Sequence, residues 1–279
     1  MKHFILNQLI RLIIYTLKLF SRVRRQSIAF WLGKVIIKVS KKTRLRAMKN
    51  IANALPELSM QQREEILTRS YQTIVFGVLE SFWLSDLENE IDILCDEHTL
   101  SLLQNKEGAS VASMHMSCYE MAPFALQQLT WPITTLSKIP SYIKSAKNIY
   151  DKANIQVINK NSDNYFLKLL QASRNKSVIC LHSDHYANDV KINFFNKKTG
   201  APNGAAIISA YSKVPLLLCY PILQKNGRYK VYIETVNANH VKSNKTDIDN
   251  ATQAIYQRFE EIILQHPNQW YWSYNRWRD

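Results

Sequence analysis

The stretch Gly108-Ala-Ser-Val-Ala-Ser-Met-His-Met-Ser-Cys-Tyr-Glu-Met-Ala-Pro-Phe-Ala-Leu-Gln-Gln128 carries two apolar patterns, one after the other. Residues 110–114 form a short β-type run, and residues 119–128 then follow a helical spacing. Another β-type run comes next, at residues 133–136. Strands that alternate with helices along a chain favour a sheet with helices on its faces. We therefore expect an α/β fold.

The same alternation continues on both sides of this stretch. Ser59 and Gln62 have the spacing of a capping box, which predicts that a helix begins there. Further β-type runs are expected at residues 155–158, 177–181, 214–222 and 229–236, and further helices at residues 165–173, 205–211 and from Asp247 or Asp249 to about 265. Lys225-Asn226-Gly227 is typical of a hairpin turn between the last two strands. The sheet should therefore be mixed, mostly parallel and flanked by helices.

Composition limits the class of protein. The chain has 279 residues, of which 46% are apolar, so it is long enough for one large domain or two small ones and can bury a core. Its four cysteines are scattered, which argues against a disulfide-stapled secreted module and favours a reducing compartment. With 36 Lys and Arg against 22 Asp and Glu, the formal net charge is +14, so anionic partners are expected.

The positive charge is concentrated at the N-terminus. Residues 1–56 contain no Asp or Glu but thirteen Lys and Arg, separated by apolar runs shorter than the roughly 20 residues of a membrane span. Cations beside a wide apolar face are typical of a helix in the headgroup region of an anionic membrane. We predict that residues 1–55 are a basic amphipathic membrane anchor and that residues 56–279 form the α/β domain. A tilted span with Arg22–Arg25 in the cytoplasm, or a basic helix packed on the domain, are the alternatives.

The candidate chemistry begins at His115. This histidine follows the strand predicted at residues 110–114, at the edge where open α/β sheets place their active sites. Glu120 follows five positions later, at the start of the next predicted helix. With His115 still in the turn, Glu120 can hydrogen-bond the ring, fix its tautomer and stabilise the imidazolium that forms when the other nitrogen removes a proton. No protein nucleophile stands out nearby, so the proton is expected to come from a substrate hydroxyl.

Around this pair the sequence resembles a known family. The block from Gly108 to Glu120 is similar to the H-x4-D/E motif of glycerolipid-type acyltransferases, and most similar to that of the lipid A biosynthesis acyltransferases of the lauroyl/myristoyl branch. Four further blocks agree with this family, in order along the chain: Arg44 with Asn50-Ile-Ala-Asn-Ala-Leu-Pro56-Glu-Leu-Ser, Ser183-Asp184-His185-Tyr186 with Phe194-Phe195, Gly204-Ala-Ala-Ile-Ile-Ser with Val214-Pro-Leu-Leu, and Pro267-Asn-Gln-Trp-Tyr-Trp272 with Arg276-Trp277.

The resemblance implies transfer of a fatty acyl group from an acyl carrier protein thioester, or from acyl coenzyme A, to a hydroxyl of a lipid A-type glycolipid precursor. It implies His115 as general base, Glu120 as its orienting partner, an acyl thioester as co-substrate, and neither a metal nor another cofactor. It also implies a place on the cytoplasmic face of the bacterial inner membrane, with acyl carrier protein, the lipid acceptor and an anionic membrane surface as partners. The substrate-binding residues expected from the matching blocks are Asp184, His185, Phe194 and Phe195, and Lys138 is added as a cation for the oxyanion of the reaction.

Two departures from the family pattern leave the acceptor open. Ser137-Lys138-Ile139-Pro140 stands where the family often has a Tyr-Arg-Pro-like element, and lysine lacks the bidentate fork of arginine. Asn196 replaces the glycine expected after Phe194-Phe195, a pair that we expect either in the core or in the lining of an acyl groove. Another amphiphile, such as an amino-acid lipid or a polyene glycolipid, is therefore an alternative acceptor.

Other functions remain to be weighed. A metal site could be formed by His182, Asp184, His185 and Asp189. Side chains at this spacing on a strand end point in different directions, however, and no further cluster of metal-binding residues elsewhere in the sequence completes such a site. The aromatic residues near the C-terminus could stack on nucleic-acid bases, but such clusters more often pack in a core or lie at a bilayer interface, and no nucleic-acid partner is expected. A noncatalytic lipid-binding membrane protein and a thioesterase are the remaining alternatives.

Overall fold

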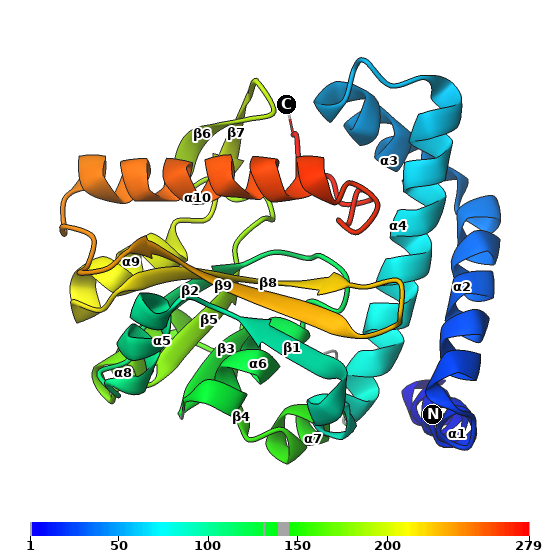
Figure 1. Ribbon diagram of the computed structural model, residues 1–279, viewed down its shortest axis with the longest axis horizontal. Coiled ribbons are helices and arrows are strands. Elements are labelled where there is room, and N and C mark those ends of the chain that lie inside the picture. Colours follow the sequence, from blue (N-terminus) through cyan, green and yellow to red (C-terminus); the bar gives the residue numbers. More distant parts are fainter. Residues whose placement is uncertain (1, 131, 139–144, 279) are drawn as a thin grey trace.

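The centre of the molecule is a seven-stranded sheet (Figure 1), in a computed structural model that describes residues 2–130, 132–138 and 145–278. The strands lie in the order β1-β9-β8-β2-β5-β3-β4. Their bounds are Ile91–Leu94 for β1, Ser110–Ser113 for β2, Ile133–Ser137 for β3, Ile155–Asn159 for β4, Val178–His182 for β5, Leu216–Leu223 for β8 and Tyr229–Asn237 for β9. Every neighbouring pair is parallel except β8 and β9. The predicted mixed, mostly parallel sheet is confirmed.

All six predicted strands are present, and β8 and β9 form the predicted hairpin. Gly227 in its turn has a φ of +85°, which glycine adopts without steric cost. A second hairpin, β6 (Val190–Phe194) with β7 (Lys197–Ala201), was not predicted. Its two turn residues, Phe195 and Asn196, both have positive φ, as a tight primed turn requires. Only Asn196 belongs to the residue types that mark such turns, so the sequence carried a weak signal there.

Helices cover both faces of the sheet, which makes three layers (Figure 1). On one face lie α8 (Tyr165–Arg174), α9 (Gly204–Ser212) and α10 (Lys245–Gln265); on the other lie α5 (Glu97–Gln104), α6 (Met121–Leu129) and α7 (Ser145–Lys152). Successive side chains of a strand point to opposite faces of the sheet, which is why there are two separate cores. In β8, Leu216 and Leu218 belong to the core under α9 and α10, whereas Leu217 and Cys219 belong to the core on the opposite face.

A layer of N-terminal helices stands beside the end of the sheet. It comprises α1 (Lys2–Lys18), α2 (Arg22–Val39), α3 (Lys41–Ala54) and α4 (Met60–Glu80), which the 3₁₀ segment η1 (Ser81–Glu90) connects to β1. The predicted capping box of Ser59 and Gln62 opens α4. α2 lies against α4 so closely that a Cβ on Gly33 would be 2.8 Å from the Cα of Gln72 (Figure 1). Arg22 of α2 also donates to the buried Glu80 at 2.6 Å.

The N-terminal segment therefore packs on the domain through α2. This packing was one of the two alternatives to a membrane anchor. Among the helices that the structure describes, none combines the length and the apolar content that crossing a bilayer requires. Several large apolar side chains of α1 and α2 are nevertheless exposed: Leu12, Ile13, Tyr15, Val23, Trp31 and Val39.

Candidate active site

His115 lies in the turn that follows β2, and this turn is held from two sides. On one side, the backbone N–H of Ser117 donates to the carbonyl of Gln269 at 2.9 Å. The backbone N–H of Tyr271 likewise donates to the carbonyl of His115 at 3.0 Å. On the other side, α4 approaches so closely at Gly77 that a Cβ there would lie 2.4 Å from the carbonyl oxygen of Ser117. The turn is thus fixed between α4 and the C-terminal part of the chain.

The neighbouring strand brings Asp184 to His115. β2 and β5 are parallel, and their register pairs Ser113 with His182. His115 and Asp184 each stand two residues beyond these positions, so strand pairing sets them side by side. Oδ1 of Asp184 lies 2.7 Å from Nδ1 of His115. Oδ2 of Asp184 accepts the backbone N–H of His115 at 2.9 Å and the indole N–H of Trp270 at 2.8 Å.

These contacts determine which nitrogen of His115 is basic. Burial alone would raise the pKa of Asp184, but the charge and hydrogen bond of His115, together with His185 and Trp270, hold it well below its usual range. The Asp184 carboxylate is therefore ionised and accepts the proton of Nδ1, which leaves the lone pair on Nε2. Within the described part of the chain, Nε2 of His115 has no hydrogen-bond partner. His115 can thus take up a proton at Nε2, beside a fixed negative charge.

Aromatic rings enclose the His115 imidazole. His185 is stacked on it, with ring centres 3.9 Å apart and planes 2° from parallel. Tyr274 is stacked on His185 at 3.7 Å, so that His185 lies between the two other rings. His182 and Tyr119 each lie 4.9 Å from the His115 ring in tilted arrangements. Burial, followed by the charge of His115, lowers the pKa of His182 to about 3 and that of His185 to about 4, so both rings are neutral near pH 7.

We expected Glu120 to hydrogen-bond the ring of His115, and the structure gives that bond to Asp184 instead. Glu120 immediately precedes α6, and its Oε1 accepts the hydroxyl of Tyr150 at 2.6 Å. Its Oε2 is buried and without a partner among the described residues. Burial raises the pKa of Glu120, against the smaller effects of Tyr150 and His115. The reason for the difference is the strand register, which carries Asp184 directly to Nδ1 whereas Glu120 belongs to the start of the next helix.

His115 and Glu120 line the same pocket, which has a volume of about 810 Å³. Part of its wall is apolar and comes from the ends of β3 and β5 and from α8 and α9; these residues are Leu136, Tyr165, Phe166, Leu169, Leu181 and Ile207. Another part is polar and includes Lys138, Lys160 and Asp189. A pocket with one apolar wall, two lysines and a basic histidine suits an amphiphilic substrate.

The model of the bacterial lipid A biosynthesis acyltransferase family matches residues 5–279. The chain belongs to this family. The resemblance seen in five separate sequence blocks is thereby confirmed, and the protein is an acyltransferase of the lipid A biosynthesis type. Comparison with curated proteins finds no match.

Of the five residues predicted to bind substrate in this lipid A acyltransferase, two line the pocket, and Asp184, Phe194 and Phe195 do not. Lys138 is exposed at the pocket and His185 forms part of its wall, whereas Ile139 and Pro140 lie outside the described residues. Phe194 and Phe195 are 0% and 7% exposed and do not line the pocket. Phe194 ends β6 and Phe195 follows it in the turn, and both pack against the tryptophans of the C-terminal segment, so they are core residues.

The donor set around His115 does not fit a metal ion. His115, Asp184 and His185 bring one possible ligand atom each to within 4.8 Å of one another. The two imidazole rings are parallel, however, so their lone pairs run side by side and do not converge on one point. The two oxygens of Asp184 are already used by His115 and Trp270.

The aromatic C-terminal segment of the acyltransferase is part of its core. Trp270, Trp272 and Arg276 are at most 2% exposed. The guanidinium of Arg276 lies 5.2 Å from the centre of the Phe194 ring and donates to the carbonyl of Gly200 at 2.8 Å. These side chains are therefore not available for stacking on nucleic-acid bases.

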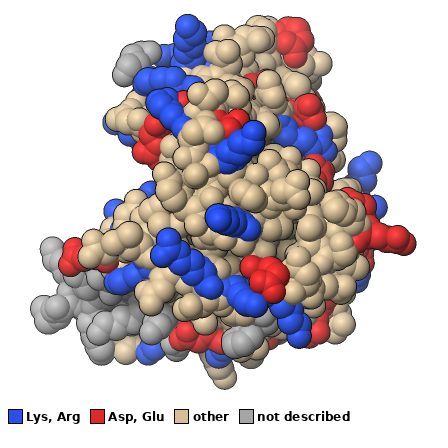
Figure 2. Space-filling model, turned by 90° about the vertical axis from the view of Figure 1, so that its left-hand side faces the viewer, with Lys and Arg blue, Asp and Glu red and all other residues tan. Residues whose placement is uncertain are grey.

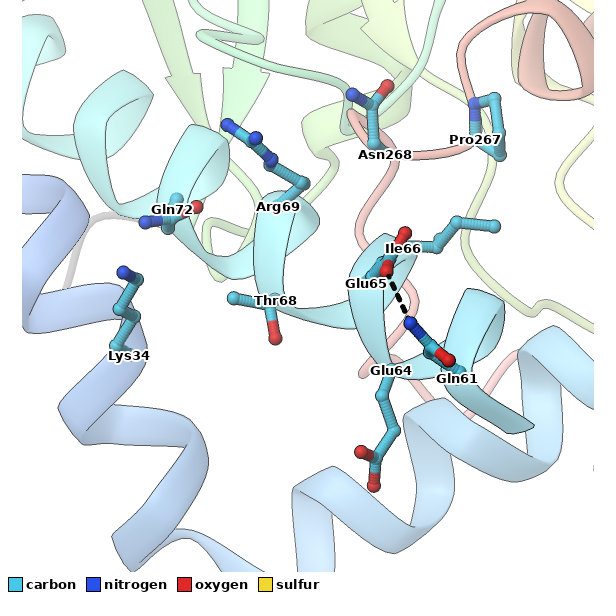
Figure 3. Close-up of a pocket in the computed structure, with 10 residues that line it drawn as sticks. All are labelled: Lys34, Gln61, Glu64, Glu65, Ile66, Thr68, Arg69, Gln72, Pro267 and Asn268. Atoms are coloured by element: carbon cyan, nitrogen blue, oxygen red, sulfur yellow. Dashed lines mark hydrogen bonds between the residues drawn. The ribbon is translucent and has the colours of Figure 1, made fainter. Parts of the chain in front are cut away.

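A second cavity, of about 860 Å³, lies between α2 and α4 beside the loop that follows α10 (Figure 3). Lys34 reaches it from α2, and Glu64, Glu65 and Arg69 line it from α4. Glu64 is paired with Arg44 at 2.7 Å. The opposite charges along this groove compensate one another, and none of its lining residues is aromatic. We therefore assign the function to the His115 pocket.

From the sequence, Asp184 was expected to shape either the acceptor pocket or the backbone around His115. Its bond to the backbone N–H of His115 agrees with the second role, whereas its bond to Nδ1 of the ring was not predicted. One signal was present: Asp184 follows the predicted strand 177–181 as His115 follows the predicted strand 110–114, so both stand at strand ends. Nothing in the sequence, however, indicated that these two strands are neighbours. Tyr150, Trp270 and Tyr274, which contact Glu120, Asp184 and His185, carried no signal of a role in the site.

Proposed function

We propose that this acyltransferase moves a fatty acyl group from an acyl carrier protein thioester to a hydroxyl of a lipid A-type glycolipid precursor, with His115 as general base. One observation carries the proposal: the 2.7 Å contact between Asp184 and Nδ1 leaves the Nε2 lone pair of His115 at a pocket that is apolar on one side and basic on another. Membership in the lipid A acyltransferase family supports the type of reaction.

The chemistry follows from the positions of these two residues. Nε2 of His115 removes the proton of the acceptor hydroxyl while the oxygen attacks the carbonyl carbon of the thioester. The carbon–sulfur bond then breaks, and the departing thiolate takes the proton back from Nε2, so that the base is regenerated. Asp184 stabilises the imidazolium between these steps and keeps the tautomer correct. We assign stabilisation of the tetrahedral oxyanion to Lys138, one of the two exposed lysines at the pocket.

Glu120 has a different role in this proposal from the one expected from the sequence. Its carboxyl is engaged by Tyr150, and the orienting contact with His115 belongs to Asp184. Glu120 then contributes to the pocket wall and to the start of α6. The proposal therefore rests on a His115–Asp184 dyad, and Glu120 enters it as a pocket residue.

The pocket also suits the two substrates. The acyl chain would lie against the apolar wall formed by α8 and α9, where burial of apolar surface stabilises it by about 25 cal/mol per Å². Lys138 and Lys160 follow the adjacent parallel strands β3 and β4, so they lie at one edge of the sheet. Two ammonium groups at one edge would attract the phosphate groups of an acceptor.

The outer surface fits an acidic carrier protein and an anionic membrane. Lysine and arginine side chains are spread over both the upper and the lower part of the face drawn in Figure 2, with acidic side chains between them. Exposed apolar residues such as Tyr15, Val23 and Trp31 accompany the cations of α1 and α2. We propose that these helices lie on the cytoplasmic face of the bacterial inner membrane, where the basic surface also meets the carrier protein.

The test uses the purified full chain with an acyl carrier protein thioester and a phosphorylated, acylated glucosamine disaccharide, with products identified by mass spectrometry. The proposal predicts an acceptor heavier by one acyl chain, and loss of that product in His115→Ala with the fold retained. His240→Ala, in a loop away from the pocket, is the matched control and should keep full activity. Full activity of His115→Ala would overturn the assignment of the base.

Product analysis also separates the alternatives. Free fatty acid with no ester would identify a thioesterase, and transfer to a different lipid in a panel of amphiphiles would identify another acceptor. Binding of lipid with no product from either carrier protein or coenzyme A thioesters would indicate a noncatalytic lipid-binding protein.

A further inference from the structure

The C-terminal segment, residues 269–278, meets the dyad of His115 and Asp184 from several directions. As described above, its backbone pairs with the His115 turn, and Trp270 donates to Asp184. Tyr274 of the same segment lies on His185, which in turn lies on His115. The end of the chain is therefore part of the surroundings of the catalytic ring, although it lies more than 150 positions away along the chain.

A hydrogen bond alone does not fix the plane of an imidazole. The bond from Nδ1 to Asp184 limits rotation of the ring about its side-chain torsion, but that torsion is broad for histidine, so small rotations remain within the range of the hydrogen bond. Such a rotation would turn the Nε2 lone pair away from a bound hydroxyl. A second constraint, perpendicular to the ring, is needed, and a parallel ring at 3.9 Å supplies it.

The stack is itself held at its outer end. The hydroxyl of Tyr274 accepts a hydrogen bond from Arg278 at 3.1 Å and one from the backbone N–H of Tyr186 at 3.3 Å. The guanidinium of Arg278 lies 4.9 Å from the centre of the Tyr186 ring. Tyr274 is therefore tied both to the chain end and to the loop that follows Asp184, so it cannot swing away independently.

We propose that His185 and Tyr274 are positioning residues, through which the C-terminal segment holds the plane of the His115 ring so that Nε2 faces the acceptor hydroxyl. The inference rests on the proposed function and deepens it. Neither residue exchanges a proton in this role; each acts by its flat surface. The neutral state of His185 agrees with this, because a charged ring would repel the imidazolium formed on His115.

Paired substitutions at His185 test the role of the flat surface. Nε2 of His185 is buried and has no hydrogen-bond partner among the described residues. Replacing the imidazole by the ring of Phe therefore breaks no hydrogen bond at Nε2. We expect His185→Ala to lower kcat by about tenfold with little change in KM for the acyl donor, because orientation and not binding is lost. His185→Phe should stay within about twofold of the wild type.

A second pair covers the case in which His185→Ala does not fold. Tyr274→Leu should lower kcat by about tenfold, and Tyr274→Phe, which keeps the ring and loses only the hydroxyl, should lower it by no more than about threefold. Tyr211→Leu is the matched control, because Tyr211 is 53% exposed on α9 and belongs to neither the stack nor the pocket lining. Thermal unfolding of each variant confirms that it is folded.

The inference is overturned if folded Ala and Leu variants keep the wild-type kcat, if the effect lies wholly in KM, or if Phe fails to rescue at both positions. NMR of the His115 ring gives a reading that is independent of activity. Loss of the stack should broaden the resonances of this ring, because the ring then moves. Sharp, unshifted resonances in a folded His185→Ala protein would also overturn the inference. Absence of ester formation by the wild type would overturn the proposed function alone, because the NMR comparison still tests the stack.

Discussion

Asp184 and Glu120 are two carboxylates beside one histidine, and their surroundings have opposite effects on them. Asp184 is bonded by the ring and the backbone of His115 and by the indole of Trp270, and its pKa is lowered. Glu120 has a single partner, Tyr150, and its pKa is raised. Both groups lose hydration on burial, so the number of donors supplied by the fold decides in which direction the pKa shifts. Proximity to His115 is thus not enough to make a carboxylate its ionic partner.

The largest expected effect is that of Asp184→Asn. Asparagine keeps the shape, but its amide can donate to Nδ1 and so favour the tautomer that has its proton on Nε2, where the base needs a lone pair. We expect kcat to fall by about 10³-fold or more. The measurement is the initial rate of ester formation with saturating substrates. A rate close to that of the wild type would show that the dyad is not the catalytic unit.

Gly77→Ala should have the next largest effect. Gly77 touches the turn between His115 and Glu120, and its new methyl group would lie 2.4 Å from the Ser117 carbonyl oxygen. We expect a loss of about 1–3 kcal/mol in the free energy of unfolding, because backbone must shift to relieve the overlap. Urea unfolding measures it. Gly204→Ala is the control, since the nearest atom to its added Cβ is a Leu181 side-chain atom at 3.4 Å, and an equal loss there would contradict the prediction.

Glu120→Gln should change activity least among these variants. The hydroxyl of Tyr150 can still donate to the amide oxygen, and no contact with His115 is lost. We expect kcat to fall by no more than about tenfold. Initial rates measured beside those of Asp184→Asn decide the comparison. If Glu120→Gln proves the more damaging of the two, the orienting carboxylate is Glu120 after all.

The pH dependence of stability should have opposite signs at the two carboxylates. Below the usual Asp pKa of 3.8, folded Asp184 binds fewer protons than the unfolded chain, so its contribution to stability is present above that pH and is lost as the pH falls. Above the usual Glu pKa of 4.5, folded Glu120 binds more protons than the unfolded chain, so stability falls as the pH rises.

Urea midpoints of the wild type and the two amide variants measure these opposite dependences. The stability deficit of Asp184→Asn relative to the wild type should be larger near about pH 6 than near about pH 3.5. Glu120→Gln should gain stability relative to the wild type as the pH rises above the usual Glu pKa of 4.5. Parallel curves for all three proteins would show that neither carboxyl has a shifted pKa in the folded state.

The sequence predicted the elements of the sheet better than their arrangement. Apolar spacing located six of its seven strands. Strands such as β2 and β5 are buried on both faces and leave short apolar runs, and β9 alternates between buried and half-buried residues. β1 and the hairpin of β6 and β7 were missed, and in that hairpin lysines occupy the first positions of β7. The capping box at Ser59 was recognisable because all of its contacts lie within four residues.

The candidate site shows the same limit. His115 could be located because it follows a predicted strand directly, and the family blocks added Asp184 and His185 to the list of substrate-binding residues. The bond between His115 and Asp184 joins residues 69 positions apart, and the one from Trp270 to Asp184 spans 86 positions. Contacts at such distances depend on which strands become neighbours, and one sequence does not record this.

By itself, then, the sequence determined the local structure, the basic N-terminus and the family, since propensity, capping, charge and motif spacing are all properties of short segments. Tertiary structure alone decided which carboxylate faces the histidine. The parallel register of β2 and β5 sets Ser113 beside His182 and so carries Asp184 to the ring, while the chain end closes over both. Glu120 is the nearer residue along the chain, but hydrogen bonds form between atoms that are close in space.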